Sequence, residues 1–217
     1  MISLQHKFIY LHVPKTGGTT IQSLLLPFSD DEKFMAPYQD GIDSFELGGL
    51  FTADKHNSLQ DYCNILGGDY ERFRIIVSAR HPVRRILSAI YSPHKWVYQD
   101  SGGDWKHKTP YWDKTLLDDI LNRPNLRPAV EFLRVDGLVR DPDVVIRCEN
   151  LESDIKKCLT FLDFPKPNAV PRANRSLASP RMIESLLADS EICTRIEEIY
   201  ADDMKFFGYS SVCATPY

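Results

Sequence analysis

Several features that would assign this chain to a specialised class are missing from its sequence. No apolar run approaches the length that crosses a bilayer, and no basic segment precedes the short apolar stretch near the start, so we expect a cytoplasmic protein. The five cysteines are odd in number and form no C-x-x-C pair, which disfavours a disulfide framework and a zinc knuckle. They are expected to be reduced thiols. A formal net charge of -4 disfavours general nucleic-acid binding, so local positive charge must meet any anionic ligand.

The remaining composition is that of an ordinary globular protein. With 43% hydrophobic and 26% charged residues, the chain fits neither a disordered nor a fibrous class. Its 217 residues can bury one sizeable α/β core and are too few for two comfortable ones. We therefore expect residues 1–217 to form a single domain.

The most informative stretch covers residues 8–26. It opens with the β-favouring apolar run Phe8–Leu11, and it closes with residues 20–26, whose apolar positions recur at helical spacing. The turn between them, residues 14–20, reads Pro-Lys-Thr-Gly-Gly-Thr-Thr and combines glycines, hydroxyls and a lysine. Amides at the start of a helix stabilise an anionic oxygen, and Lys15 adds a full positive charge. This composition predicts a phosphate-binding loop between a strand and a helix.

The loop does not match the Walker A pattern, because Lys15 precedes the two glycines and no glycine stands five positions before Gly18. An ordinary ATP or GTP kinase is therefore disfavoured. The loop resembles instead the 5′-phosphosulfate loop of sulfotransferases that use 3′-phosphoadenosine 5′-phosphosulfate (PAPS). The likeness is closest to the carbohydrate-type branch, which includes the heparan 2-O-sulfotransferases and many bacterial relatives. On this motif alone, a glycine-containing turn without a ligand stays an alternative.

The resemblance implies roles for the loop residues. Lys15 would be catalytic, because its charge would neutralise the bridging oxygen as the sulfuryl group leaves. The implied ligands of the phosphosulfate are Lys15, Thr16, Gly17, Gly18, Thr19 and Thr20.

A second candidate lies before the next predicted helix. Ser58 and Asp61 approximate a capping box, and the apolar positions that follow them predict a helix that ends at a glycine pair. His56 stands just before this helix. The resemblance implies that His56 is the catalytic base, since histidine is suited to proton transfer near neutrality. The alternatives are a loop histidine without a role and a nearby carboxylate, Asp54 or Glu46, as the base.

A second motif that supports the resemblance to the sulfotransferases covers residues 74–91. The near-continuous apolar run Ile75–Ala79 is typical of a parallel strand buried on both faces, and Pro82 suits the first turn of a helix. Arg80 would then lie at the carboxyl edge of the sheet, where ligands of open α/β folds bind. The resemblance implies that Arg80 and Ser88, eight residues apart, bind the 3′-phosphate of the donor. Arg84 and Arg85 are read as solvated surface charge.

The composition changes over residues 93–113, which hold all three tryptophans and several cations. Indole faces pack on sugar rings and lysines pair with acidic groups, so this insert could face a sugar or an acidic acceptor. A small satellite core beneath a long loop explains the tryptophans equally well.

Further along the chain, the patterns predict additional elements. Short helices are expected near 115–121 and 127–133, a strand over Val144–Arg147 and a helix through residue 162. Residues 192–207 predict one amphipathic closing helix. By contrast, residues 27–50 read as an irregular connection, and residues 50–52 as a brief strand. The family tends to carry an Asn-x-Ser-like segment that closes over the nucleotide, which adds Arg175 and Ser176 as possible donor contacts.

Two anion motifs about sixty residues apart favour one interpretation. The sequence predicts a P-loop NTPase-like, mostly parallel sheet flanked by helices in three α/β/α layers. It predicts transfer of a sulfuryl group from PAPS to a hydroxyl, with a glycan favoured as the acceptor, and release of adenosine 3′,5′-bisphosphate (PAP). No metal is expected, because His12, His56 and His81 match no ligand spacing. A kinase with an unusual phosphate loop and a catalytically inactive nucleotide-binding scaffold stay open as alternatives.

Overall fold

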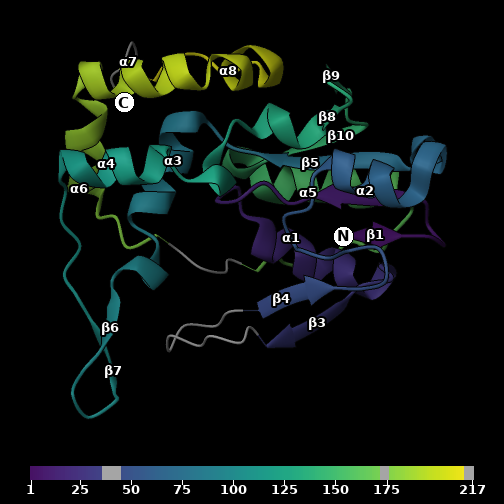
Figure 1. Ribbon diagram of the computed structural model, residues 1–217, viewed down its shortest axis with the longest axis horizontal. Helices are drawn as coiled ribbons and strands as arrows, with labels where there is room; N and C mark the ends of the chain where they lie inside the picture. Colours follow the sequence, from purple (N-terminus) through teal and green to yellow (C-terminus); the bar gives the residue numbers. More distant parts are fainter. Residues whose placement is uncertain (36–44, 172–175, 213–217) are drawn as a thin grey trace. The chain divides into compact units, whose positions relative to one another are not determined.

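A computed structural model describes residues 1–35, 45–171 and 176–212, and the chain divides into two compact units (Figure 1). The first unit contains residues 1–35, 45–80 and 129–171 of the described chain, and the second contains residues 81–128 and 176–212. No helix within the described ranges is long and apolar enough to cross a membrane. The single domain expected from chain length stays a prediction.

The first unit is built on a four-stranded sheet with the strand order β1-β2-β5-β10. The strands are β1 (Ile2–Ser3), β2 (Phe8–Leu11), β5 (Arg74–Ala79) and β10 (Val144–Arg147). Strands β2, β5 and β10 are parallel, whereas β1 pairs with β2 in the antiparallel sense. The mixed α/β class and the mostly parallel central sheet predicted from the sequence are therefore confirmed.

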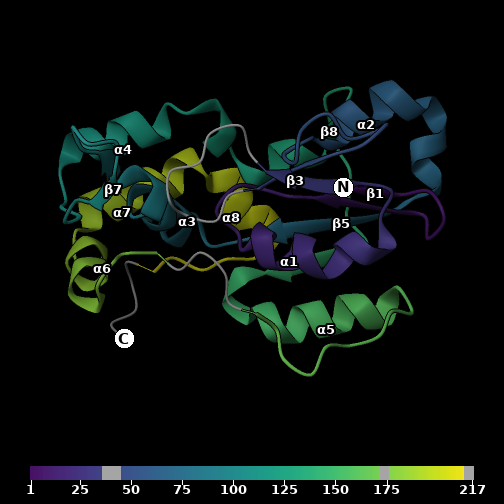
Figure 2. The same cartoon turned by 90° about the horizontal axis from the view of Figure 1, so that it is seen from below.

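Helices cover both faces of this sheet (Figure 2). Helices α1 (Gly18–Leu25) and α5 (Leu151–Phe161) pack on one face, and α2 (Leu59–Leu66) lies on the other. The core on the α1 and α5 side includes Phe8, Tyr10, Ile76 and Ile146, together with Ile21, Leu25, Ile155 and Leu159 of the helices. All four residues of β2 are buried, because side chains alternate between two covered faces.

The connection after α1 is more regular than the sequence predicts. The segment contains a 3₁₀ turn, η1 (Leu26–Phe28), and an antiparallel hairpin of β3 (Glu32–Met35) and β4 (Phe45–Gly48). Strand β3 was missed because all four of its side chains are exposed, so no apolar alternation marks it. The predicted strand over residues 50–52 is wrong: Leu50 is 88% exposed, and only an isolated bridge joins Gly49 to Thr52.

Short elements complete the first unit. Helix α2 is followed by η2 (Gly67–Arg72), and its predicted capping box is present, with Ser58 and Asp61 exchanging hydrogen bonds. The predicted short helix near 127–133 is the 3₁₀ helix η5 (Ala129–Leu133). A small hairpin, β8 (Arg134–Val135) and β9 (Leu138–Val139), and the 3₁₀ turn η6 (Cys148–Asn150) follow.

The second unit is mainly helical (Figure 1). Its helices are α3 (Pro82–Ile90), α4 (Lys114–Leu121), α6 (Pro180–Leu187), α7 (Ser190–Ile199) and α8 (Ala201–Phe207), with short 3₁₀ turns η3 (Pro93–Lys95) and η4 (Pro124–Leu126). The hairpin of β6 (Val97–Gln99) and β7 (Trp105–His107) extends away from α3 and α4. The core of the second unit contains apolar residues from α3, α4, α6 and α7.

Two predictions in the second unit are wrong. The closing helix is broken at Tyr200 into α7 and α8, because the buried Tyr200 hydroxyl donates to the Leu126 carbonyl oxygen at 2.6 Å and its backbone leaves the helical region. Arg85 is fully buried rather than solvated. Its guanidinium donates to the Arg127 carbonyl oxygen at 2.9 Å and lies 3.8 Å from the carboxylate of Asp203. Periodicity alone could not identify this buried ion pair.

Candidate functional site

The predicted phosphate loop connects β2 to α1 and has an unusual backbone. Lys15 has φ +69° and Gly17 has φ +86°, both in the left-handed region, and Gly17 is the N-cap of α1. When left-handed residues alternate with others along a turn, successive backbone amides point toward a common concavity, which is a feature of anion-binding nests. In the described chain, no hydrogen bond is present from the amides of residues 16–19. These donors lie at the positive end of the α1 dipole and suit an anionic ligand.

A buried chain of hydroxyl groups anchors the loop to the sheet. Thr16 Oγ1 lies 2.6 Å from both the Val13 carbonyl oxygen and Ser78 Oγ, and the Tyr10 hydroxyl lies 3.0 Å from Ser78 Oγ. Thr16 and Ser78 are fully buried. The side chain of Thr16 therefore faces the sheet, which leaves its backbone amide as the group available to a ligand. Thr20 is similarly engaged, because its Oγ1 donates to the Pro171 carbonyl oxygen at 3.1 Å.

Arg80 immediately follows β5, as predicted, and contacts the loop. Its guanidinium donates to the Lys15 carbonyl oxygen at 3.2 Å. This contact arises because β2 and β5 are adjacent and parallel, so that their carboxyl ends lie at one edge of the sheet. Two cationic side chains, Lys15 and Arg80, thus come from segments of the same edge.

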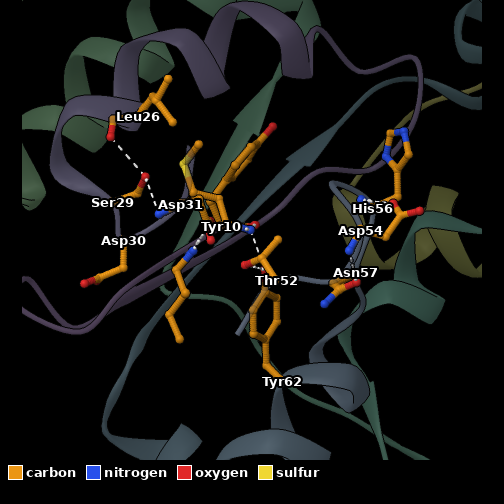
Figure 3. Close-up of polar contacts among 12 residues, drawn as sticks. Tyr10, Leu26, Ser29, Asp30, Asp31, Thr52, Asp54, His56, Asn57 and Tyr62 are labelled. Atoms are coloured by element: carbon orange, nitrogen blue, oxygen red, sulfur yellow. Dashed lines mark hydrogen bonds and ion pairs between the residues drawn. The ribbon is translucent and has the colours of Figure 1, made fainter. Parts of the chain in front are cut away.

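His56 lies in the turn before α2 and reaches the same edge. Figure 3 shows it in one turn with Asp54 and Asn57, its imidazole pointing away from both side chains. The His56 amide donates to Asp54 Oδ1, and His56 Nδ1 lies 2.9 Å from the carbonyl oxygen of His12, just after β2. A carbonyl oxygen can only accept, so Nδ1 carries the proton and Nε2 keeps its lone pair. This tautomer suits a general base acting through Nε2.

Burial favours the neutral form of the His56 imidazole. Desolvation is the main cause that lowers the pKa of His56 below 6.5, and the cation of Lys55 lowers it further. The hydrogen bond to the His12 carbonyl oxygen, Asp54 and Glu46 act in the opposite direction. The Lys55 ammonium is held by Glu46 at 3.0 Å and by the Phe45 carbonyl oxygen at 2.9 Å. His56 is therefore unprotonated near neutral pH.

The carboxylates considered as alternative bases have structural partners. Asp54 accepts the His56 amide proton, and Asn57 Oδ1 accepts from the Asp54 amide at 3.1 Å, which closes the turn. Glu46 pairs with Lys55. His56 has a proton held on Nδ1 and a lone pair available on Nε2. Neither carboxylate has this arrangement.

The second unit contains the other residues that the sequence predicts to contact PAPS. On α3, Arg84 and Ser88 are the partly exposed residues of an otherwise buried helix and share one face. Ser176 lies beside the end of this helix: its Oγ donates to the Tyr91 carbonyl oxygen at 3.4 Å, and the Leu177 amide donates to the same oxygen at 2.9 Å. Arg175 lies outside the described residues.

The insert over residues 93–113 divides its aromatic residues between two roles. Trp96 is buried, donates from Nε1 to the Ile90 carbonyl oxygen at 2.8 Å and meets Tyr111 edge to face. Trp112 packs against the core of the second unit. Tyr98 and Tyr111 are exposed, and Lys108 lies over the Tyr98 ring. The alternative of a satellite core therefore holds for Trp96 and Trp112, whereas the exposed tyrosines stay available to a ligand.

The described part of the chain contains no group of three or more His, Cys, Asp or Glu side chains arranged to hold a metal ion. The four cysteines within the described ranges, Cys63, Cys148, Cys158 and Cys193, are all free thiols. Burial raises the pKa of Cys158 to about 12, so this thiol stays protonated.

Two residues at this edge were not assigned roles from the sequence. Ser78 places a hydroxyl group within the apolar run of β5, and a buried hydroxyl needs a hydrogen-bond partner. This polar residue in an apolar strand was the signal in the sequence that could have identified it. From the sequence, His12 was considered among the histidines that match no metal-ligand spacing. The structure places its ring between the start of α1 and His56.

A comparison with protein families gives a match over nearly the whole chain. The model of the family described as "Sulfotransferase family" matches residues 1–210. No curated protein and no solved structure matches significantly.

Proposed function

Because the chain belongs to the sulfotransferase family, we propose that it transfers a sulfuryl group from PAPS to a hydroxyl of a carbohydrate acceptor. We further propose that the sheet of the first unit is P-loop NTPase-like. The observation that carries the proposal is the meeting, at one sheet edge, of the amide-lined loop, Arg80 and a histidine base with a defined tautomer. The exposed tyrosines of the insert support a sugar acceptor, because aromatic faces pack on sugar rings.

The donor would be held at two places. The amides of residues 16–19 and the ammonium of Lys15 bind the 5′-phosphosulfate, while Arg80 and Ser88 bind the 3′-phosphate. Thr20 completes the loop, and Ser176 and Arg175 contribute to the nucleotide side. A donor with two separate anionic groups needs two anion sites, whereas an ATP enzyme needs one cradle with magnesium carboxylates.

The chemical step follows from the tautomer of His56. His56 Nε2 accepts the proton of the acceptor hydroxyl while the oxygen attacks sulfur, and the bond from sulfur to the bridging oxygen breaks. The electron pair of that bond stays on the 5′-phosphate of PAP, where Lys15 neutralises the developing charge. The His12 carbonyl oxygen keeps the proton on Nδ1 and stabilises the imidazolium that forms.

The first test is calorimetric titration with PAP, with ADP and with ATP plus magnesium. We expect PAP to bind at least tenfold more tightly than ADP, since a charge-assisted hydrogen bond contributes about 1.5–3 kcal/mol. A preference for ATP with magnesium would instead favour the kinase. Binding of none of these nucleotides would favour a scaffold that keeps the fold without a nucleotide site, and either result overturns the proposal.

The 3′-phosphate role is tested by Arg80→Ala. This variant should lose about tenfold or more in PAP affinity and much less in ADP affinity, because ADP has no 3′-phosphate. Arg195→Ala is the control, because Arg195 pairs with Asp118 on the surface of the second unit, and it should bind both nucleotides normally. Equal losses for PAP and ADP would refute the role.

The base is tested by His56→Ala with PAPS and a panel of oligosaccharides. Turnover should fall about 10²- to 10⁴-fold while the PAP dissociation constant stays within threefold, because positioned base catalysis contributes that much. Glu46→Gln and Asp54→Asn should keep turnover within about tenfold. Near wild-type turnover in His56→Ala, with a large loss in either carboxylate variant, would transfer the role to that carboxylate.

A further inference from the structure

The His12 imidazole occupies a confined position next to the candidate base. His12 follows β2 and is only 7% exposed. Its ring stacks on Tyr10 with a centroid separation of 6.3 Å and an interplanar angle of 13°. On the side of the base it contacts the ring of His56, with centroids 4.4 Å apart and planes tilted by 44°.

The same ring contacts the first residue of the loop helix. A Cβ atom built on Gly18 would lie 1.8 Å from His12 Cδ2 and 1.9 Å from Nε2, far inside van der Waals contact. The imidazole edge therefore occupies the space that any other residue at position 18 would fill. His12 thus contacts the start of α1 and the ring of His56 at the same time.

The surroundings keep this imidazole neutral. Burial lowers its pKa well below 6.5, and the neighbouring His56 ring and the Lys55 and Lys15 ammonium groups act in the same direction. Within the described chain, His12 Nδ1 is buried and has no hydrogen-bond partner. A neutral ring whose Nδ1 makes no hydrogen bond adds no charge beside Lys15 and leaves the hydrogen bond of His56 to the His12 carbonyl oxygen undisturbed.

We infer that His12 is a positioning residue: its imidazole is a spacer that sets the distance and tilt of the His56 ring relative to the phosphate loop. This inference rests on the proposed function, because it concerns the alignment of His56 Nε2 with the group held by the loop. A misplacement of about 1 Å in a reacting group can cost about 100-fold in rate. The contact to Gly18 couples the base to the loop in a way that the His12 carbonyl oxygen alone does not.

Three variants separate the spacer role from simple packing. His12→Phe keeps a flat ring and removes the nitrogens, whereas His12→Ala removes the spacer. His6→Ala is a matched control, because His6 also packs against aromatic rings, with centroids 4.8 Å from Phe164, but lies before the opposite end of β2.

The direct readout is the imidazole ¹H–¹⁵N spectrum of His56, which needs no substrate. The wild type should show a protonated Nδ1 with a slowly exchanging proton and an unprotonated Nε2. In His12→Ala that proton should exchange at least tenfold faster, whereas His12→Phe and His6→Ala should leave it nearly unchanged. An unchanged His56 spectrum in folded His12→Ala overturns the inference. If His12→Ala does not fold, His12→Phe decides alone, because loss of the slow proton in that variant also overturns it.

The second readout separates turnover from donor binding. His12→Ala should lower kcat for PAP formation from PAPS about tenfold to 100-fold, with a PAP dissociation constant within threefold of wild type. His12→Phe should stay within about threefold in both. Wild-type protein that binds no PAP would refute the proposed function, while the His56 spectra would still decide the role of His12. Normal wild-type turnover with unaffected His12→Ala would refute the role of His12 alone.

Discussion

The close approach of His12 to Gly18 makes Gly18→Ala the most informative single substitution. Two effects oppose each other, because alanine is favoured over glycine within a helix by about 1 kcal/mol. The new Cβ would lie 1.8 Å from His12 Cδ2, whereas real Cβ contacts stay above 3.0 Å, so the ring must move by more than 1 Å. Tyr10 and His56 confine that ring, and forced repacking of this kind costs about 1–3 kcal/mol. The steric effect should therefore prevail.

Gly68→Ala is the matched control, because Gly68 lies in η2 and its added Cβ would meet no atom within 4 Å. Urea unfolding should show Gly18→Ala less stable than wild type by up to about 2 kcal/mol and Gly68→Ala unchanged or slightly more stable. Combining Gly18→Ala with His12→Ala should cost less than the sum of the two single changes, since the second change removes the clash. A folded Gly18→Ala protein as stable as Gly68→Ala would refute the reasoning.

Two further predictions concern buried titratable side chains. The pKa values of His12 and His56 are lowered from 6.5 in the folded protein, so the unfolded chain binds more protons as pH falls below about 6.5. The free energy of unfolding should be fully retained above that pH and fall below it, by at most about 1.4 kcal/mol per pH unit for each histidine, and His12→Phe should flatten the decline in urea titrations. Asp203→Asn should cost about 3–5 kcal/mol, because it removes a negative charge that faces the buried Arg85, whereas Asp118→Asn at an exposed pair should cost less than about 1 kcal/mol. Equal costs for the two aspartate variants would contradict the importance of burial.

The wrong predictions made from the sequence share one physical cause. Strand β3 has no buried side chain, and Arg85 stands on a helix whose periodicity does not distinguish an inward arginine from an outward one. The break at Tyr200 depends on a hydroxyl that finds the Leu126 carbonyl oxygen 74 residues away in the sequence. Local pattern carries no information about such distant partners.

Local chemistry was sufficient for the elements that carry the site. The apolar run of β2, the glycines of the loop, the capping box at Ser58 and the proline at the start of α3 each specify local backbone geometry, and all were found as predicted. The order of β2 and β5 in a parallel sheet then places Lys15 and Arg80 at one edge, which follows from strand polarity.

Only the tertiary structure decided how the candidate base is held. The proton on His56 Nδ1 depends on a carbonyl oxygen 44 residues earlier, and the ring of His12 fits only because position 18 has no side chain. The sequence by itself determined which chemical groups stand at the carboxyl ends of the strands. Their tautomer, spacing and charge state depend on desolvation and contacts between segments far apart in the chain, which exist only after the sheet and its helices have packed.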